Sequence, residues 1–122
     1  MTKRILIADD DDDLRQALVQ LLELEGFAIE SAPDSRATLG LAPTLACDLI
    51  LLDVFMPGAN GLDVLASLHN LLPQVPIIMM SGQAGRNTAA NALSFGAYAF
   101  ILKPFDDESV LATVKQALGL VN

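Results

Sequence analysis

Four apolar runs in this chain each end in a polar residue, and these polar residues differ in their chemistry. The runs ILIA, LILL, PIIMM and FIL lead into Asp9-Asp10, Asp53, Ser81 and Lys103. Groups at the carboxyl ends of parallel strands converge on one crevice, which is where open α/β sheets bind ligands. The runs therefore predict one site with three carboxylates, one hydroxyl and one amine, a set suited to a divalent cation and a phosphoryl group.

The size and hydropathy of the chain favour one soluble α/β domain covering residues 1–122. Of its 122 residues 52% are hydrophobic, and the mean hydropathy is +0.46. Such richness fits strands that are buried on both faces. No apolar run approaches the roughly 20 residues of a membrane span. The start MTKRILIADD lacks the apolar core of a secretion signal, so we expect a cytoplasmic protein with no membrane partner.

Charge and cysteine content exclude several classes of site. The net charge of −8 and the pI near 4.2 argue against nucleic-acid binding by this domain, because phosphate backbones attract basic surfaces. Cys47 is the only cysteine, so neither an internal disulfide nor a metal-thiolate cluster is expected. We expect Cys47 to be a small buried residue.

Apolar spacing and Gly/Pro punctuation predict a strict alternation of strands and helices. The expected strands are residues 3–8, 27–31, 48–53, 77–80 and 98–102, and the expected helices are residues 13–25, 35–41, 62–72, 87–95 and 106–118. Residues 54–60 are expected to form a loop. The alternation implies a parallel sheet with helices on both faces. Tyr98 and the four methionines are expected in the core, except that Met56, beside Pro57, is expected to shape the loop of the site, and His69 is expected at the surface or half-buried.

The five consecutive aspartates divide into two groups. Asp9 and Asp10 come directly off a strand, and carboxylate oxygens are the ligands that Mg²⁺ prefers, usually one or two of them with water and phosphate. The next three, Asp11 to Asp13, fit the start of a helix, where the dipole stabilises acids and one of them can be the N-cap.

Asp53 is the predicted nucleophile, since a carboxylate can accept a phosphoryl group as an acyl phosphate. Lys103 would supply a fixed cation and Ser81 a hydroxyl donor to a phosphoryl oxygen. Taken singly, each has another reading: Asp53 as a turn acid, Lys103 as a surface lysine, Ser81 as a cap or turn residue. Four such residues ending four strands favour one shared site.

The stretches ILIADDDDDLR, LILLDVFMPGANGLDVL, PIIMMSGQAG and GAYAFILKPF resemble the receiver domains of two-component response regulators, and the resemblance covers essentially the whole chain. It implies a flavodoxin-like, three-layer (βα)5 domain with a five-stranded parallel sheet of order 2-1-3-4-5. It also implies a cis Lys103-Pro104 peptide bond.

The resemblance assigns a role to each residue of the site. Asp53 would be the phosphoacceptor. Asp10 and Asp53 would bind Mg²⁺ together with the Phe55 carbonyl, and Asp9 would be an outer-shell contact of the metal. Lys103 would bind the phosphoryl group.

The resemblance further implies a conformational switch. Ser81 would be the switch hydroxyl and Phe100 the switch aromatic, where many relatives have tyrosine. Phe55 and Gln83 would flank the acyl phosphate and influence the access of water. The output face would comprise helix 87–95, strand 98–102 and helix 106–118.

By the same resemblance the domain is a signalling switch and not a turnover enzyme. Its partner would be a sensor histidine kinase or a phosphotransfer protein. The output domain or target stays open, as does a homodimer through the output face.

Three alternatives compete with this interpretation. A phosphatase of the haloacid-dehalogenase type needs a second acid two residues after the nucleophile, where this chain has Phe55. A nucleotide- or flavin-binding domain needs a glycine- or hydroxyl-rich phosphate loop after the first strand, where this chain has five aspartates. A receiver-like protein-interaction domain that works without phosphorylation stays open, although all five site residues are present.

Overall fold

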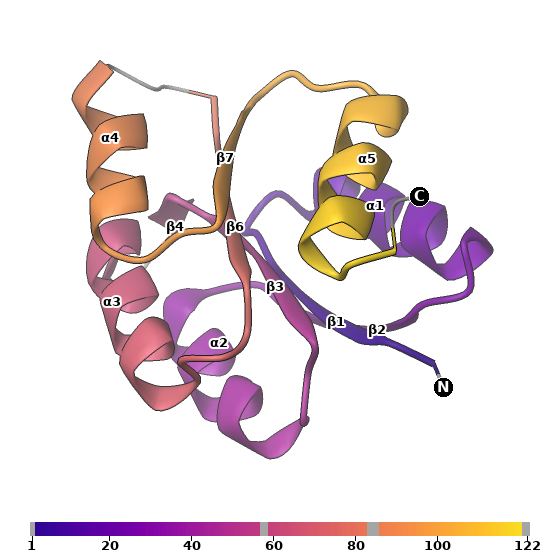
Figure 1. The fold of residues 1–122 in the computed structure, drawn as a ribbon, viewed down its shortest axis with the longest axis horizontal. Helices are drawn as coiled ribbons and strands as arrows, with labels where there is room; N and C mark the ends of the chain where they lie inside the picture. The colour runs from indigo at the N-terminus through magenta and orange to yellow at the C-terminus, as the bar shows by residue number, and fades with distance from the viewer. Residues whose placement is uncertain (1, 57–58, 83–85, 121–122) are drawn as a thin grey trace.

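A computed structural model describes residues 2–56, 59–82 and 86–120. Its central sheet contains five parallel strands in the order β2-β1-β3-β6-β7, namely β1 (Arg4–Ala8), β2 (Ala28–Ala32), β3 (Leu49–Asp53), β6 (Ile77–Ser81) and β7 (Ala99–Leu102) (Figure 1). Numbered by sheet strand alone, this order is 2-1-3-4-5, and the predicted flavodoxin-like topology is confirmed.

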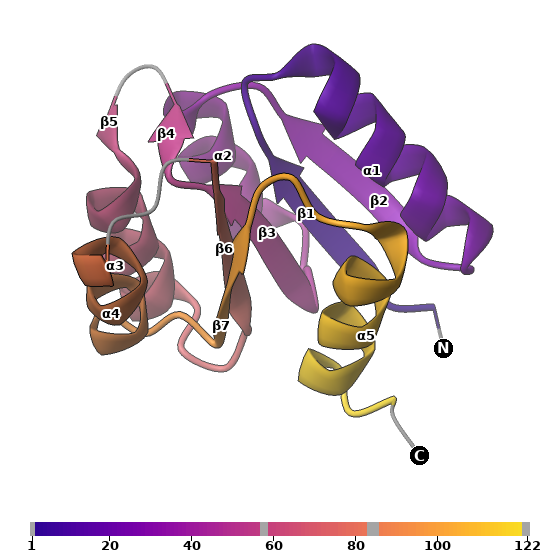
Figure 2. The same cartoon turned by 90° about the horizontal axis from the view of Figure 1, so that it is seen from above.

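Helices cover both faces of the sheet, which gives the three layers. They are α1 (Asp12–Leu24), α2 (Ser35–Leu41), α3 (Gly61–Leu71), α4 (Arg86–Ser94) and α5 (Asp107–Ala117), with a short 3-10 turn at Ala42–Thr44. Helices α1 and α5 lie on one face, and α2, α3 and α4 on the other, as two views at right angles show (Figures 1 and 2). Within the described ranges, no helix is long and apolar enough to cross a bilayer.

The strands supply alternate side chains to two cores, because successive residues of a strand point to opposite faces. In β1, Ile5 and Ile7 pack under α1 and α5, while Leu6 and Ala8 pack under α2 and α3. All five residues of β3 are buried, as expected for a central parallel strand. Cys47 is buried at 6% exposure, which confirms its predicted place.

The chain after Asp53 is more ordered than the predicted loop. Strand β4 (Phe55–Met56) pairs antiparallel with β5 (Ala59–Asn60), and α3 begins immediately afterwards. The sequence could not predict this ribbon, since two residues are too few to show a strand period. Elsewhere the observed bounds of the ten predicted strands and helices differ from the predicted ones by no more than one residue.

Two details of the loops were predicted correctly. Asp11 is the N-cap of α1, where its side chain accepts a hydrogen bond from the Leu14 N–H at 3.1 Å. The Lys103-Pro104 peptide bond is cis.

The prediction that Tyr98 lies in the core is wrong. Its side chain is 45% exposed, because it immediately precedes β7, the edge strand of the sheet, where packing is one-sided. Met79 and Met80 are buried as predicted, Met56 is also buried, and Met1 lies outside the described residues. His69 is half-buried in the last turn of α3, which also agrees with expectation.

Candidate functional site

The parallel sheet brings the predicted polar residues to one edge. Asp9 follows β1, Asp53 ends β3, Ser81 ends β6 and Lys103 follows β7. The sheet register extends past the last strand residues, since the Lys103 N–H donates to the Ser81 carbonyl at 2.7 Å. Residues far apart in the sequence are therefore held together by backbone pairing of buried strands, which defines their positions closely.

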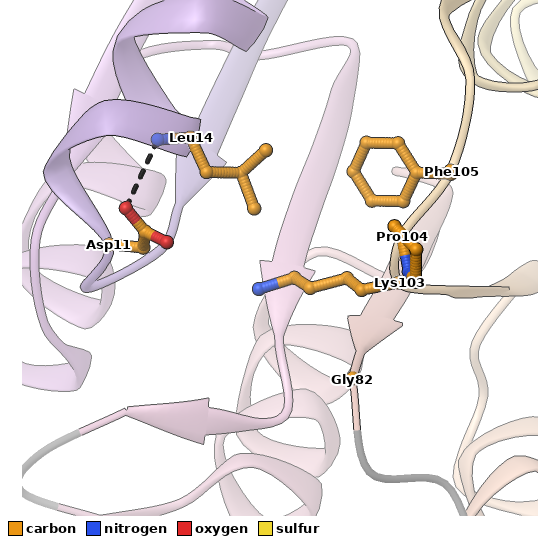
Figure 3. A pocket seen from close by; sticks show the side chains of 6 residues that line it. All are labelled: Asp11, Leu14, Gly82, Lys103, Pro104 and Phe105. Atoms are coloured by element: carbon orange, nitrogen blue, oxygen red, sulfur yellow. Dashed lines mark hydrogen bonds between the residues drawn. The ribbon is translucent and has the colours of Figure 1, made fainter.

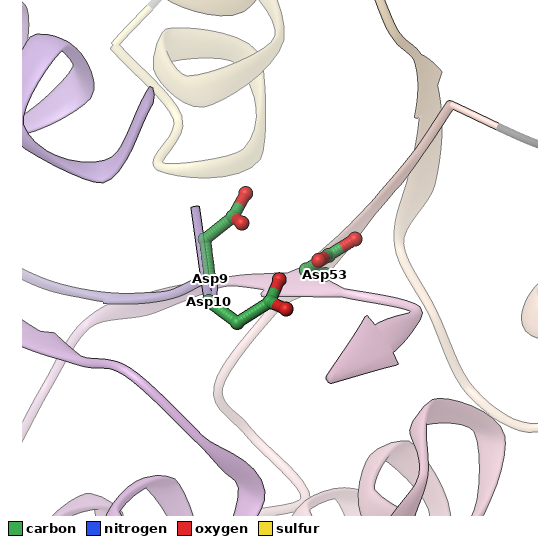
Figure 4. A group of neighbouring side chains, drawn as sticks. All are labelled: Asp9, Asp10 and Asp53. Carbon is green, nitrogen blue, oxygen red and sulfur yellow. The ribbon is translucent and has the colours of Figure 1, made fainter. Parts of the chain in front are cut away.

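Three carboxylates gather at this edge. Asp9, Asp10 and Asp53 each place an oxygen within 4.8 Å of the others (Figure 4). Asp9 is fully buried and Asp53 is 4% exposed, whereas Asp10 is exposed. Because buried carboxylates repel one another through a medium of low polarity, this arrangement needs a positive charge.

Lys103 supplies one such charge. Its Nζ donates a hydrogen bond to Asp9 Oδ2 at 2.9 Å and lies 3.4 Å from Asp53 Oδ1. The lysine side chain is 20% exposed and so reaches the carboxylates from the rim of the site. One ammonium facing three carboxylates leaves an excess of negative charge, which favours a bound cation.

The surroundings perturb the acid–base properties of two of these groups. Burial, and next the charge of Asp9, raise the pKa of Asp53 from 3.8 to about 6, while Lys103 and a hydrogen bond with the Phe55 backbone oppose the shift. Burial disfavours the charged form of Lys103, but its hydrogen bond to Asp9 and its attraction to Asp53 outweigh that effect and raise the pKa of Lys103.

The residues present fit a small divalent cation. Carboxylate oxygens from two strand ends meet within one ion's reach, and the exposed Asp10 leaves a side open to water and to a phosphate oxygen. Phe55, the fourth predicted ligand, begins β4 two residues after Asp53, and its side chain is 55% exposed. The ligand role of its carbonyl stays a prediction.

The two predicted switch residues lie on neighbouring strands. Ser81 is fully buried, and Phe100 is half-buried against the core under α2, α3 and α4. Gln83, the other predicted neighbour of the acyl phosphate, lies outside the described residues. The structure thus places Ser81 at the acidic edge and Phe100 within β7, while their switching roles stay predictions.

A pocket with a largely apolar wall adjoins the lysine. Its volume is about 380 Å³, and it is lined by Asp11, Leu14, Gly82, Lys103, Pro104 and Phe105 (Figure 3). Leu14 was not among the site residues predicted from the sequence. Its position one residue after the aspartate run was the available signal, because the first turn of α1 must lie beside the carboxylates.

Comparisons with known proteins agree on one family. The model of the response regulator receiver domain matches residues 5–115. Regulatory protein AtoC of Escherichia coli K12 is 35% identical over 117 residues, which are 96% of this chain and 25% of that protein. Relative to the curated proteins that it matches first, the chain spans between 25% and 54% of their length.

Solved structures give the same result. A response regulator receiver domain protein from Methanospirillum hungatei JF-1 superposes with a TM-score of 0.95 at 33% identity, covering 98% of this chain and 95% of that one. A response regulator protein from Burkholderia pseudomallei, which contains a phosphorylated aspartic acid, a calcium ion and citrate, has a TM-score of 0.87 at 30% identity, covering 96% of this chain and 69% of that one.

Proposed function

The chain belongs to the response regulator receiver domain family, and from that premise we propose that Asp53 is its phosphoacceptor in a two-component signalling system. The donor would be a sensor histidine kinase or a phosphotransfer protein. The domain would promote its own phosphorylation and dephosphorylation, without turning over a separate substrate.

One observation carries this proposal. The Asp53 carboxylate lies between an ammonium, 3.4 Å from its Oδ1, and two further carboxylates whose oxygens come within 4.8 Å. A turn acid needs neither neighbour. A phosphoryl acceptor needs both, because the incoming group carries negative charge. The ammonium stabilises that charge directly, and the carboxylates hold a divalent cation that does the same.

The transfer forms a bond between an Asp53 oxygen and phosphorus, and it breaks the bond from phosphorus to the imidazole nitrogen of the donor. Asp53 must be ionised to attack, and with its pKa near 6 it is mostly ionised at neutral pH. Lys103 would turn its N–H donors toward the phosphoryl oxygens, and Ser81 would donate its hydroxyl to one of them. Mg²⁺, held by Asp10, Asp53 and the Phe55 carbonyl, with Asp9 behind them, would screen the repulsion between the two anions.

Phosphorylation would be read at the surface formed by α4, β7 and α5. Movement of Ser81 toward the phosphoryl group would leave room for Phe100 to turn inward, and α4 would follow. Support comes from four large apolar side chains exposed on these elements or next to them, Leu93 at 53%, Phe95 at 44%, Tyr98 at 45% and Leu102 at 56%. They suit a surface that contacts another protein.

The partners and the location follow from this role. The domain would act in the cytoplasm and contact an output domain or a target protein. Any binding of nucleic acid would be by that partner, because the domain's own net charge is −8. A homodimer through the α4-β7-α5 surface is a second use of the same apolar residues.

Intact-protein mass after incubation with acetyl phosphate and Mg²⁺ tests the proposal directly. We expect a gain of about 80 Da, one phosphoryl group, in the wild type and none in Asp53→Asn. Asp63→Asn, which changes an exposed acid of α3, is the matched control and should gain the same mass. No gain in the folded wild type would reject the proposal and favour a receiver-like domain that works without phosphorylation.

A further inference from the structure

Arg15 contacts the acidic cluster from α1 and is not among the residues that the proposed chemistry uses. Its Nη1 donates a hydrogen bond to the backbone carbonyl of Asp9 at 2.7 Å, and its Nη2 lies 2.5 Å from Asp12 Oδ1. The Arg15 side chain is only 12% exposed, whereas that of Asp12 is 78% exposed. The guanidinium is thus largely buried against the loop that joins β1 to α1.

The carbonyl that Arg15 binds belongs to the peptide group between Asp9 and Asp10. An arginine donor to a carbonyl is a charge-assisted hydrogen bond, stronger and more directional than a neutral one. Fixing this peptide plane fixes the direction in which the chain leaves Asp9. The orientation of the next residue, Asp10, depends on that direction.

Asp9 does not depend on Arg15 for its own position. Its N–H donates to the Ala32 carbonyl at 3.1 Å, its Oδ1 accepts from the Asp11 N–H at 3.0 Å, and its Oδ2 accepts from Lys103 at 2.9 Å. By contrast, no hydrogen bond or ion pair joins the exposed Asp10 carboxylate to any residue in the described ranges. Asp10 is therefore placed by its backbone alone.

The helix geometry explains why an arginine at this position reaches the loop. Side chains of an α-helix tilt toward its N-terminus, and Arg15 is in the first turn, where its N–H bonds to the Asp11 carbonyl at 2.9 Å. Asp12 holds one arm of the planar guanidinium, which aims the other arm at Asp9. A lysine has a single ammonium and cannot make both contacts in this fixed geometry.

We infer that Arg15 is a positioning residue for divalent-cation binding: by holding the Asp9-Asp10 peptide group it orients the Asp10 carboxylate toward Asp53. The inference rests on the proposed function, because it assigns a role within the same cation site. It goes beyond that function because a residue that does not bind the cation would contribute to the affinity of the site for it.

The sign of the effect separates positioning from simple electrostatics. Arg15 carries a positive charge beside a site for a cation, so its charge alone opposes binding, and removing it would make Mg²⁺ bind more tightly. Loss of positioning acts in the opposite direction. Removing a residue that orients a metal ligand typically lowers metal affinity by about 10- to 100-fold.

The test is isothermal titration of the full chain with Mg²⁺ as wild type, Arg15→Met and Arg15→Lys. Methionine keeps an unbranched stem but has neither charge nor donors. We expect the dissociation constant of Arg15→Met to rise about tenfold and that of Arg15→Lys to recover only part of the loss. Arg36→Met, which removes an exposed arginine of α2 that makes no hydrogen bond or ion pair within the described residues, should bind like the wild type.

The outcomes distinguish the two levels of the argument. Wild-type protein that shows no binding heat of either sign with Mg²⁺, at two temperatures, would contradict the cation site of the proposed function. Wild-type binding with equal or tighter binding by Arg15→Met would overturn the positioning role and leave the cation site intact. Far-ultraviolet circular dichroism of each variant without Mg²⁺ shows whether it is folded. If Arg15→Met is not folded, the comparison of wild type with Arg15→Lys decides, because lysine keeps the positive charge but lacks the two-armed guanidinium.

Discussion

Lys103 Nζ lies 2.9 Å from a carboxylate oxygen of Asp9, although the two residues are 94 positions apart in the chain. The sheet makes this contact possible, since β1 and β7 end at the same edge with β3 and β6 between them. This ion pair therefore forms only when the sheet is assembled, and it is also part of the candidate site.

Replacing Lys103 by methionine should destabilise the metal-free protein more than the loss of an ordinary lysine does. Asp9 is fully buried, and removing its partner leaves a buried charge uncompensated, which costs on the order of 3 kcal/mol. Urea denaturation with a chelator at neutral pH measures the difference. Lys115→Met is the control, because its pair with Glu25 is of equal length, 2.9 Å, but 40% and 34% exposed, and such pairs contribute about 1 kcal/mol or less. Equal losses in the two variants would contradict the prediction.

The raised pKa of Asp53 makes stability depend on pH. A carboxyl with a higher pKa in the folded than in the unfolded protein binds protons more tightly when folded, so the free energy of unfolding falls as pH rises between the two values. For Asp53 the window runs from 3.8 to about 6. Above the window, ionised Asp53 costs on the order of 2–3 kcal/mol.

Asp53→Asn should therefore be more stable than the wild type at neutral pH without metal, by about that amount. The two proteins should converge as pH falls through the window, because the wild-type carboxyl becomes neutral too. Denaturation curves at several pH values measure this. A stability difference that does not change with pH would show that the charge of Asp53 is not the cause.

The sequence predicted the sheet and the site for the same physical reason. Buried parallel strands appear as continuous apolar runs, and the residue after each run must lie at the carboxyl edge, so Asp9, Asp53 and Lys103 could be grouped without coordinates. Arg15 could not be grouped in this way. Its proposed role depends on the rotamer of a long side chain and on the direction of one backbone carbonyl. The sequence shows neither of these. Tyr98 was misplaced because its position was predicted from hydropathy alone, which does not show that β7 is an edge strand, although the strand order implied by the resemblance did.

Mg²⁺ should raise the melting temperature of the wild type, because an ion that binds only the folded state stabilises it by mass action. At a tenfold excess over the dissociation constant the gain is about 1.4 kcal/mol, or about 4–7 °C for a domain of this size. Asp10→Ala should lose most of the rise. An undiminished rise in that variant would show that the ion binds elsewhere.

Phe55 should slow loss of the phosphoryl group. Phe55 is 55% exposed two residues after Asp53, the proposed phosphoacceptor, where its ring can cover the approach of water to an acyl phosphate. Phe55→Ala should shorten the lifetime of phosphorylated protein several-fold, measured by intact mass after the donor is removed. Phe95→Ala, a change of a similarly exposed phenylalanine at 44%, is the control and should leave the lifetime unaltered. Equal lifetimes in all three proteins would exclude shielding by Phe55.

Gly61 joins the loop after Asp53 to α3, and no larger residue fits there. A Cβ at this position would lie 2.0 Å from the Val54 carbonyl oxygen, a backbone atom that cannot turn aside as a side chain can. Gly61→Ala must therefore displace either the start of α3 or the chain at Val54, next to Asp53. We expect a loss of more than about 2 kcal/mol, as for other overpacked sites, together with slower phosphorylation.

Gly40→Ala, on α2, is the same substitution without a backbone clash. A Cβ there meets nothing within 4 Å, so alanine should stabilise the protein by about 0.5–1 kcal/mol through the reduced freedom of the unfolded chain. Thermal denaturation of both variants compares the same substitution with and without a backbone clash. If Gly61→Ala were as stable as Gly40→Ala, the backbone at Val54 would move at little cost, and the close packing of Gly61 against the residue after Asp53 would not be a rigid feature of the fold.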